Sequence, residues 1–190
     1  MAALSEPFTS GSGLDSGTFL SAVYQETGGT LDFYFQITLN STSTNCGAIA
    51  AGQPACDSIL GMTDSSFLGF TTSAATRIDG LTLSGSFFTN GTVFPISADR
   101  NSLGDIVGFS FTPPGSAALQ PGQTSIVLVI GTNATKFAPG TATLLDGGTT
   151  TLASFAPSGG GSPTPEPSSL LLLGTGLLGL GPLLRRFGRA

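Results

Sequence analysis

The feature that most constrains the fold is a strict alternation of apolar and polar residues between positions 31 and 39. Leu31, Phe33, Phe35, Ile37 and Leu39 are apolar, and the residues between them are polar or amphipathic. Successive side chains of a β-strand point to opposite faces, so this spacing predicts a strand with one buried face. The chain is therefore expected to build a sheet that packs one face against a core.

Weaker runs of the same kind recur along the chain. They predict further strands over residues 18–24, 66–72, 77–83, 87–94 and 106–111. Five consecutive branched aliphatic residues, Ile126 to Ile130, predict a strand over residues 125–132 that is covered on both faces. Turn-forming sequences of two or three residues separate these runs: Thr27-Gly28-Gly29, Asp79-Gly80, Asn90-Gly91, Pro113-Pro114-Gly115, Pro121-Gly122, Pro139-Gly140 and Asp146-Gly147-Gly148. Many short strands joined by such turns predict an all-β domain, either an antiparallel β-sandwich or a jelly roll.

Changes in composition divide the 190 residues into four parts. Residues 1–17 are rich in Ser and Gly and contain no apolar run, so we expect a loose N-terminal segment. Residues 18–156 carry the strand pattern and form the predicted sandwich. Residues 157–164 combine glycines with prolines, a composition typical of a flexible linker. Residues 165–190 form a separate C-terminal segment.

Charge and motifs argue against several classes of function. Residues 1–164 contain ten acidic and three basic residues, and nucleic-acid binding needs a clustered basic face. The chain has no histidine, and no nucleophile elbow, phosphate-binding loop, zinc helix or EF-hand spacing is present. We therefore expect no enzyme, no cofactor and no metal centre.

Acidic residues leave two alternatives open. A pair of carboxylates could cleave a glycoside, but the sequence does not give their separation in space. Acidic turns could also bind calcium through carboxylate and carbonyl oxygens. The candidates are Asp57, Asp64, Asp79, Asp99 and Asp105, and most of them are interpreted as turn residues.

The two cysteines, Cys46 and Cys56, have nine residues between them. In an oxidising compartment they are expected to form a disulfide, which would stabilise the fold by about 2 to 3 kcal/mol. The alternatives are two unrelated thiols or a metal site, and a metal site would lack its other ligands.

The segment from Leu170 to Leu184 has no charged residue. A helix of that length spans about 22 Å, which is less than the roughly 30 Å hydrocarbon core, and Pro182 would bend it. Leucines lie on every face of such a helix, which excludes an amphipathic core helix and predicts one short transmembrane helix. These leucines are Leu170, Leu171, Leu172, Leu173, Leu177, Leu178, Leu180, Leu183 and Leu184.

A basic cluster of Arg185, Arg186 and Arg189 follows the span. Positive flanks stay on the cytoplasmic side, so the sandwich is expected to face outward. Residues 1–7 lack the basic patch and the apolar stretch of a secretory signal. We therefore expect a start site assigned too late, with the signal peptide lying upstream of Met1.

The order of features in this C-terminal segment resembles a known sorting signal. Pro165-Glu166-Pro167 precedes an apolar span that begins at Ser168, and Arg185-Arg186 follows. Together they resemble the PEP-CTERM signal of Gram-negative bacteria. That resemblance implies recognition by exosortase, a membrane cysteine protease and transpeptidase. It also implies cleavage near the tripeptide, a transient stay in the inner membrane, and a link to exopolysaccharide and biofilm.

These features lead to one main expectation and two alternatives. The chain is expected to be a non-enzymatic protein of the cell surface or extracellular matrix, with exosortase, the membrane and exopolysaccharide as partners. The alternatives are a carbohydrate-binding adhesin and a permanently anchored single-pass membrane protein. Exposed aromatic side chains would favour the adhesin, because sugars stack on them.

Overall fold

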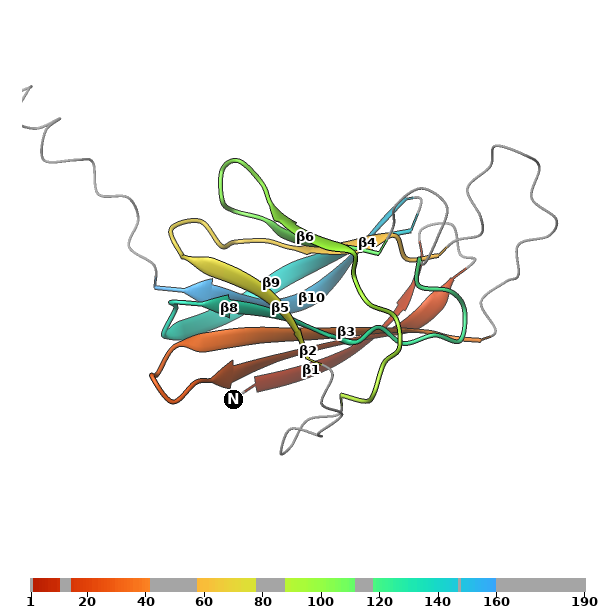
Figure 1. Cartoon of the computed structure of the whole chain (residues 1–190), viewed down its shortest axis with the longest axis horizontal. Coiled ribbons are helices and arrows are strands. Elements are labelled where there is room, and N and C mark those ends of the chain that lie inside the picture. The colour runs from red at the N-terminus through yellow and green to blue at the C-terminus, as the bar shows by residue number, and fades with distance from the viewer. Residues whose placement is uncertain are drawn as a thin grey trace, which may run out of the picture. The chain divides into compact units, whose positions relative to one another are not determined.

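A computed structural model describes residues 2–10, 15–41, 58–77, 88–111, 118–146 and 148–159. The chain divides into two units, residues 1–160 and residues 161–190, and the second lies outside the described residues. Every described element is a β-strand (Figure 1). Among the described residues, no helix is long and apolar enough to cross a membrane.

Ten strands form two five-stranded sheets. The first sheet has the order β1 (Ala2–Thr9), β2 (Ser16–Gln25), β3 (Leu31–Leu39), β8 (Val127–Thr132) and β5 (Thr72–Arg77). The second has the order β10 (Thr149–Ser158), β9 (Lys136–Leu145), β4 (Gly61–Asp64), β7 (Val107–Ser110) and β6 (Ser97–Arg100). All neighbouring strands are antiparallel, which confirms the predicted all-β class.

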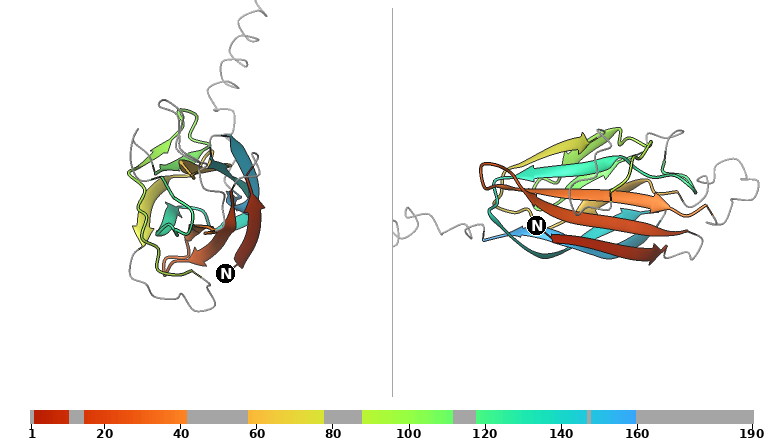
Figure 2. Two further views of the ribbon diagram at one scale, coloured as in Figure 1. Left: turned by 90° about the vertical axis from the view of Figure 1, so that its right-hand side faces the viewer. Right: turned by 90° about the horizontal axis from the view of Figure 1, so that it is seen from below.

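The core lies between the two sheets. Phe33, Phe35 and Ile37 of β3 face Met62 of β4 and Leu144 of β9 in one buried cluster. Phe33 also meets the buried ring of Phe67 edge-on, with 5.8 Å between ring centroids. The apolar half of the 31–39 alternation is thus the inner face of β3, as predicted, and the sheets form a sandwich (Figure 2).

The N-terminal segment corrects one prediction. Residues 2–9, expected to be loose, form strand β1 and pair with β2 from Ala2↔Val23 to Thr9↔Ser16. Sequence analysis missed this strand because residues 2–9 alternate only weakly between apolar and polar and include Pro7. A proline is compatible with β1 because β1 is an edge strand. Glu6 also accepts a hydrogen bond at 2.6 Å from the backbone amide of Ala153 on β10.

The β9–β10 hairpin corrects two further predictions. Pro139-Gly140 was predicted to be a turn but lies inside β9, and residues 157–158, assigned to the linker, belong to β10. Strand β4 pairs with β9 only over Leu145 to Ala142, so no β4 ladder bond is needed at Pro139. A Cβ at Gly140 would lie 2.7 Å from the Cβ of Ala156, so this position accepts only glycine without a shift.

The predicted strand at residues 66–72 is also wrong. Ser66 has a φ of 76° and Gly69 one of 85°, conformations of turns. The turn joins β4 to β5, and the side chain of Arg100 supports it by donating to the carbonyl oxygens of Phe67 and Phe70, at 3.0 and 2.9 Å.

Residues 88–94, also predicted as a strand, form only an isolated parallel bridge between Val93 and Ser125. A buried side chain holds this segment instead. The amide of Gln36 on β3 donates to the carbonyl oxygen of Thr89 at 2.7 Å and accepts from the Thr89 amide at 2.9 Å. The same amide nitrogen donates to the carbonyl oxygen of Ser125 at 2.9 Å. Gln36 therefore takes the place of a strand partner for the backbone at Thr89.

Candidate functional site

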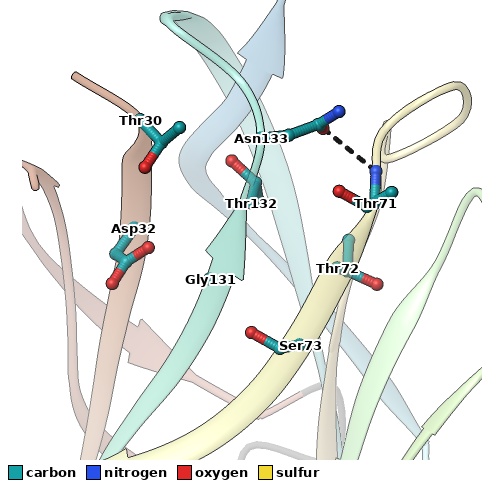
Figure 3. A pocket seen from close by; sticks show the side chains of 8 residues that line it. All are labelled: Thr30, Asp32, Thr71, Thr72, Ser73, Gly131, Thr132 and Asn133. Carbon is teal, nitrogen blue, oxygen red and sulfur yellow. Dashed lines mark hydrogen bonds between the residues drawn. The ribbon is translucent and has the colours of Figure 1, made fainter. Parts of the chain in front are cut away.

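A polar trough crosses one end of the first sheet on its outer face. It encloses about 380 Å³ and is lined by Thr30, Asp32, Thr71, Thr72, Ser73, Gly131, Thr132 and Asn133 (Figure 3). Cross-strand register explains why these residues meet. Asp32 on β3 pairs with Gly131 on β8, and Gly131 pairs with Ser73 on β5, so the three lie in one row across three adjacent strands.

Gly131 forms the floor of the trough. A Cβ at this position would lie 2.7 Å from the hydroxyl oxygen of Ser73 and 3.3 Å from Oδ1 of Asp32. The space between the carboxylate and the hydroxyl exists because residue 131 has no side chain.

Two of the lining side chains, Asn133 and Thr132, make hydrogen bonds to the backbone around the trough. Asn133 Oδ1 accepts a hydrogen bond from the amide of Thr71 at 3.0 Å, as Figure 3 shows. The Thr132 hydroxyl donates to the carbonyl oxygen of Leu31 at 2.7 Å and accepts from the amide of Ala134 at 3.1 Å. The wall residues are thus positioned by the backbone on both sides of the trough.

Asp32 is the charged group of the trough. Burial raises the pKa of its carboxyl, and the negative charge and hydrogen bond of nearby Glu26 raise it further, while the Thr132 backbone lowers it. Burial and the nearby Glu26 carboxyl therefore make the Asp32 carboxyl easier to protonate than an isolated one. The arrangement favours ligand groups that donate hydrogen bonds.

The outer face next to the trough carries a small apolar cluster. It contains Ala22, Tyr24, Phe88, Val127 and Val129, with Leu20 and Tyr34 packed against it. The rings of Tyr24 and Tyr34 meet at 4.9 Å and an interplanar angle of 72°. Burial raises the pKa of Tyr34, and the negative charges of Asp32 and Glu26 raise it further, whereas the positive charge of Arg77 lowers it. Tyr24 is thus buried, and its contact with the half-buried Tyr34 covers part of both rings.

A second acidic residue is buried in the core. Asp64 on β4, one of the five acidic candidates from the sequence, is 1% exposed. The hydroxyl of Ser154 on β10 donates to its Oδ2 at 2.9 Å, and its Oδ1 has no hydrogen-bond partner among the described residues. Burial raises the pKa of Asp64 to about 8, although hydrogen bonds from Ser154 and the Ser65 backbone act against this. Asp64 is therefore a protonated, structural carboxyl at neutral pH.

Two of the other acidic candidates, Asp99 and Asp105, lie within the described residues. Asp99 is exposed on β6. Asp105 follows a turn, and its backbone amide donates a hydrogen bond to Asn101 Oδ1 at 2.8 Å. No group of three or more His, Cys, Asp or Glu side chains able to hold a metal occurs within the described ranges. Asp57 and Asp79 lie outside those ranges.

Several predicted site residues also lie outside the described residues. They are the disulfide candidates Cys46 and Cys56, the tripeptide Pro165-Glu166-Pro167, the span from Leu170 to Leu184, and Arg185, Arg186 and Arg189. Their pairing, helix and orientation stay predictions. The trough itself was missed by sequence reasoning, since Asp32 appeared only as a polar residue of the 31–39 alternation.

Comparison with known proteins identifies the C-terminal segment. Residues 163–189 match the family model of the PEP-CTERM protein-sorting motif. The chain therefore carries a PEP-CTERM sorting signal, which confirms the resemblance found in its sequence. The match supports a secreted or surface protein that exosortase processes. No curated protein and no solved structure matches the chain.

Proposed function

We propose that this chain is a non-enzymatic protein of the cell surface or extracellular matrix, tethered in the inner membrane by its C-terminal segment until exosortase removes that segment. The sorting motif over residues 163–189 carries this proposal. Two of the acidic residues considered for catalysis have other surroundings: Asp64 accepts a hydrogen bond from Ser154 in the core, and Asp99 is exposed on β6. Association with exopolysaccharide is part of the same proposal.

The chemistry of the tail suits a temporary tether. Two prolines around Glu166 favour extended backbone and keep the tripeptide from joining a following helix. An extended segment fits a protease cleft, and a span of about 22 Å holds the substrate only weakly in a bilayer core of about 30 Å. Arg185, Arg186 and Arg189 would keep the far end in the cytoplasm.

Processing gives the direct test of this function. In a host with active exosortase, the exported protein should lack the residues beyond the tripeptide. The whole chain weighs 19.0 kDa, so losing the 23 residues after Pro167 would make it about 2 to 3 kDa lighter. Replacing Pro165, Glu166 and Pro167 by alanine should leave uncleaved protein in the membrane, because the tripeptide becomes compatible with a helix.

Intact-mass spectrometry of the exported and membrane fractions measures this outcome. Deletion of residues 185–189 is the matched control, because it leaves the tripeptide intact and should impair retention and orientation instead of cleavage. Wild-type protein that still ends at Ala190 in cells with active exosortase would support a permanent single-pass anchor and overturn the proposal.

We propose carbohydrate recognition by the trough as a second candidate function. The supporting observation is the row of Asp32, Gly131 and Ser73, where a carboxylate and a hydroxyl face a floor without a side chain. Sugar hydroxyls can donate to Asp32 and both donate to and accept from Ser73. With Tyr24 and Tyr34 packed against each other, recognition would rely on these hydrogen bonds and not on stacking.

Filling the floor tests the second candidate. Gly131→Ala should weaken binding to any hit on a glycan array by about tenfold or more, because the new methyl group occupies the space between the two polar groups. Gly28→Ala is the matched control, since a Cβ there would meet nothing within 4 Å. An array without saturable binding by the wild type, or equal binding by Gly131→Ala, would remove this candidate.

A further inference from the structure

The chain leaves the sandwich for its C-terminal segment at one particular end. Strand β10 ends there at Ser158, which pairs with Lys136 at the start of β9. The connection over residues 65–71 leads from β4 to β5 at the same end, and the connection over residues 101–106 joins β6 to β7 there (Figure 1). We call this the exit end.

Each of these two connections presents a leucine to solvent. Leu68 is 57% exposed and Leu103 is 76% exposed. The neighbour of Leu68, Phe67, is fully buried in the core and fixes the first connection to the sandwich. Single exposed leucines are ordinary, whereas exposed apolar side chains that lie together mark an interaction surface.

Hydrogen bonds hold the two connections side by side. The amide of Phe67 donates to the carbonyl oxygen of Asp105 at 2.8 Å. The guanidinium of Arg100 donates to the carbonyl oxygens of Phe67 and Gly104, both at 3.0 Å. The two leucines are the direct chain neighbours of Phe67 and Gly104, so they belong to one patch with a fixed backbone.

No undescribed internal segment starts or ends beside this patch. The strands that border those segments reach them at the opposite end of the sandwich, where β1 leads to β2, β3 leads to β4 and β9 leads to β10. The segments are residues 11–14, 42–57, 78–87, 112–117 and 147. The two leucines are therefore open to a partner outside the sandwich.

The chain between the exit end and the predicted span is short. Eleven residues, 159–169, separate the end of β10 from Leu170. Even when fully extended they reach no more than about 40 Å, so the exit end stays near the bilayer while the chain is tethered. Such a tether gives the leucines an effective concentration of roughly millimolar at the lipid surface, so that weak apolar contacts are enough for docking.

The charges of the exit end do not select anionic lipid. Acidic and basic side chains both occur among its described residues: Glu26, Asp32, Asp105, Arg100 and Lys136. Binding to anionic headgroups needs a cluster of basic residues, and these side chains do not form one. Insertion of apolar side chains into the interface is the contact that this end can make with a membrane.

We propose that the exit end docks on the outer surface of the membrane that holds the C-terminal segment, with Leu68 and Leu103 inserted into the interfacial layer of the lipid. This inference rests on the proposed tethering and adds an orientation to it. The sandwich lies against the bilayer as long as the tail is uncleaved. Cleavage removes the tether, and with it the effective concentration that makes two leucines sufficient.

Tryptophan fluorescence tests the docking, because the chain contains no tryptophan of its own. Leu68→Trp and Leu103→Trp each place a single tryptophan in the patch of the full chain, reconstituted into phosphatidylcholine vesicles whose acyl chains carry bromine. Bromine quenches tryptophan only at close range. Emission from both variants should be at least about twofold lower than in vesicles without bromine, since an inserted side chain reaches the boundary of the acyl chains.

Leu145→Trp is the matched control, because Leu145 is also a partly exposed leucine but lies at the opposite end, where β9 ends. Its emission should be equal in the two kinds of vesicle. Adding Leu103→Asp to Leu68→Trp should abolish most of the quenching, since a charge beside the tryptophan opposes insertion of the patch. Circular dichroism checks that each variant is folded.

Flotation of the vesicles separates the docking from the tethering on which it rests. A full chain that does not float with the vesicles would overturn both. A chain that floats, while both exit-end tryptophans emit equally with and without bromine, would overturn the docking and leave the tethering standing. Equal quenching of Leu145→Trp would also overturn the docking, because the contact would then not belong to the exit end.

Discussion

Replacing Gly91 by alanine is expected to destabilise the sandwich by at least about 3 kcal/mol, a large effect for one methyl group. A Cβ at Gly91 would lie 1.8 Å from the carbonyl oxygen of Ser125 and 2.7 Å from the amide nitrogen of Ile126. Both are backbone atoms of the buried segment that leads into β8, so neither can rotate away. The segment from residue 88 to 93 must instead lift off, which breaks the hydrogen bonds that Gln36 makes with Thr89.

Thermal unfolding followed by circular dichroism checks this expectation. The melting temperature of Gly91→Ala should fall by about 6 °C or more, given a shift of roughly 2–4 °C per kcal/mol for a domain of this size. Gly28→Ala in the turn before β3 is the control and should stay within about 0.5 kcal/mol of the wild type. Equal melting temperatures for the two variants would contradict the close approach at Gly91.

The stability of the wild type is expected to fall as the pH rises from about 4 to about 8. The unfolded chain loses the Asp64 proton near pH 4, whereas burial raises the folded pKa to about 8. Between these values only the folded state holds the proton, so raising the pH favours unfolding. The stabilising contribution is complete below pH 4 and lost as the pH passes about 8, with an upper limit of about 6 kcal/mol.

Asp64→Asn isolates this contribution, because an amide keeps an acceptor for the Ser154 hydroxyl and cannot ionise. Chemical denaturation at pH 5 and pH 9 gives the free energy of unfolding at each pH. Its decrease from pH 5 to pH 9 should be larger in the wild type than in the variant by about 2 kcal/mol or more. Asp99→Asn is the control, since Asp99 is exposed on β6. The same loss between pH 5 and pH 9 in the wild type and Asp64→Asn would show that Asp64 is not the group responsible.

The amino-acid sequence alone determined the all-β class, the strand from Leu31 to Leu39 and the sorting signal. Each is a local property. Apolar residues at every second position reflect the alternation of side chains along one strand. A sorting motif is a linear order of residues. The strands near residues 18–24 and 106–111 were found for the same reason and correspond to β2 and β7. A continuous run of branched aliphatic residues at 126–130 predicted the strand that corresponds to β8.

Only the tertiary structure decided which strands lie next to each other. The features on which the proposals rest depend on that arrangement. Strand β1 owes its place to β2 and to Glu6 beside β10, and Pro139 is tolerated in β9 because β4 stops short of it. The row of Asp32, Gly131 and Ser73 joins three strands that are distant in the chain. Burial of Asp64 and the position of the two leucines at the exit end likewise depend on how the two sheets overlap. Such contacts depend on long-range register, which neighbouring residues along the chain do not encode.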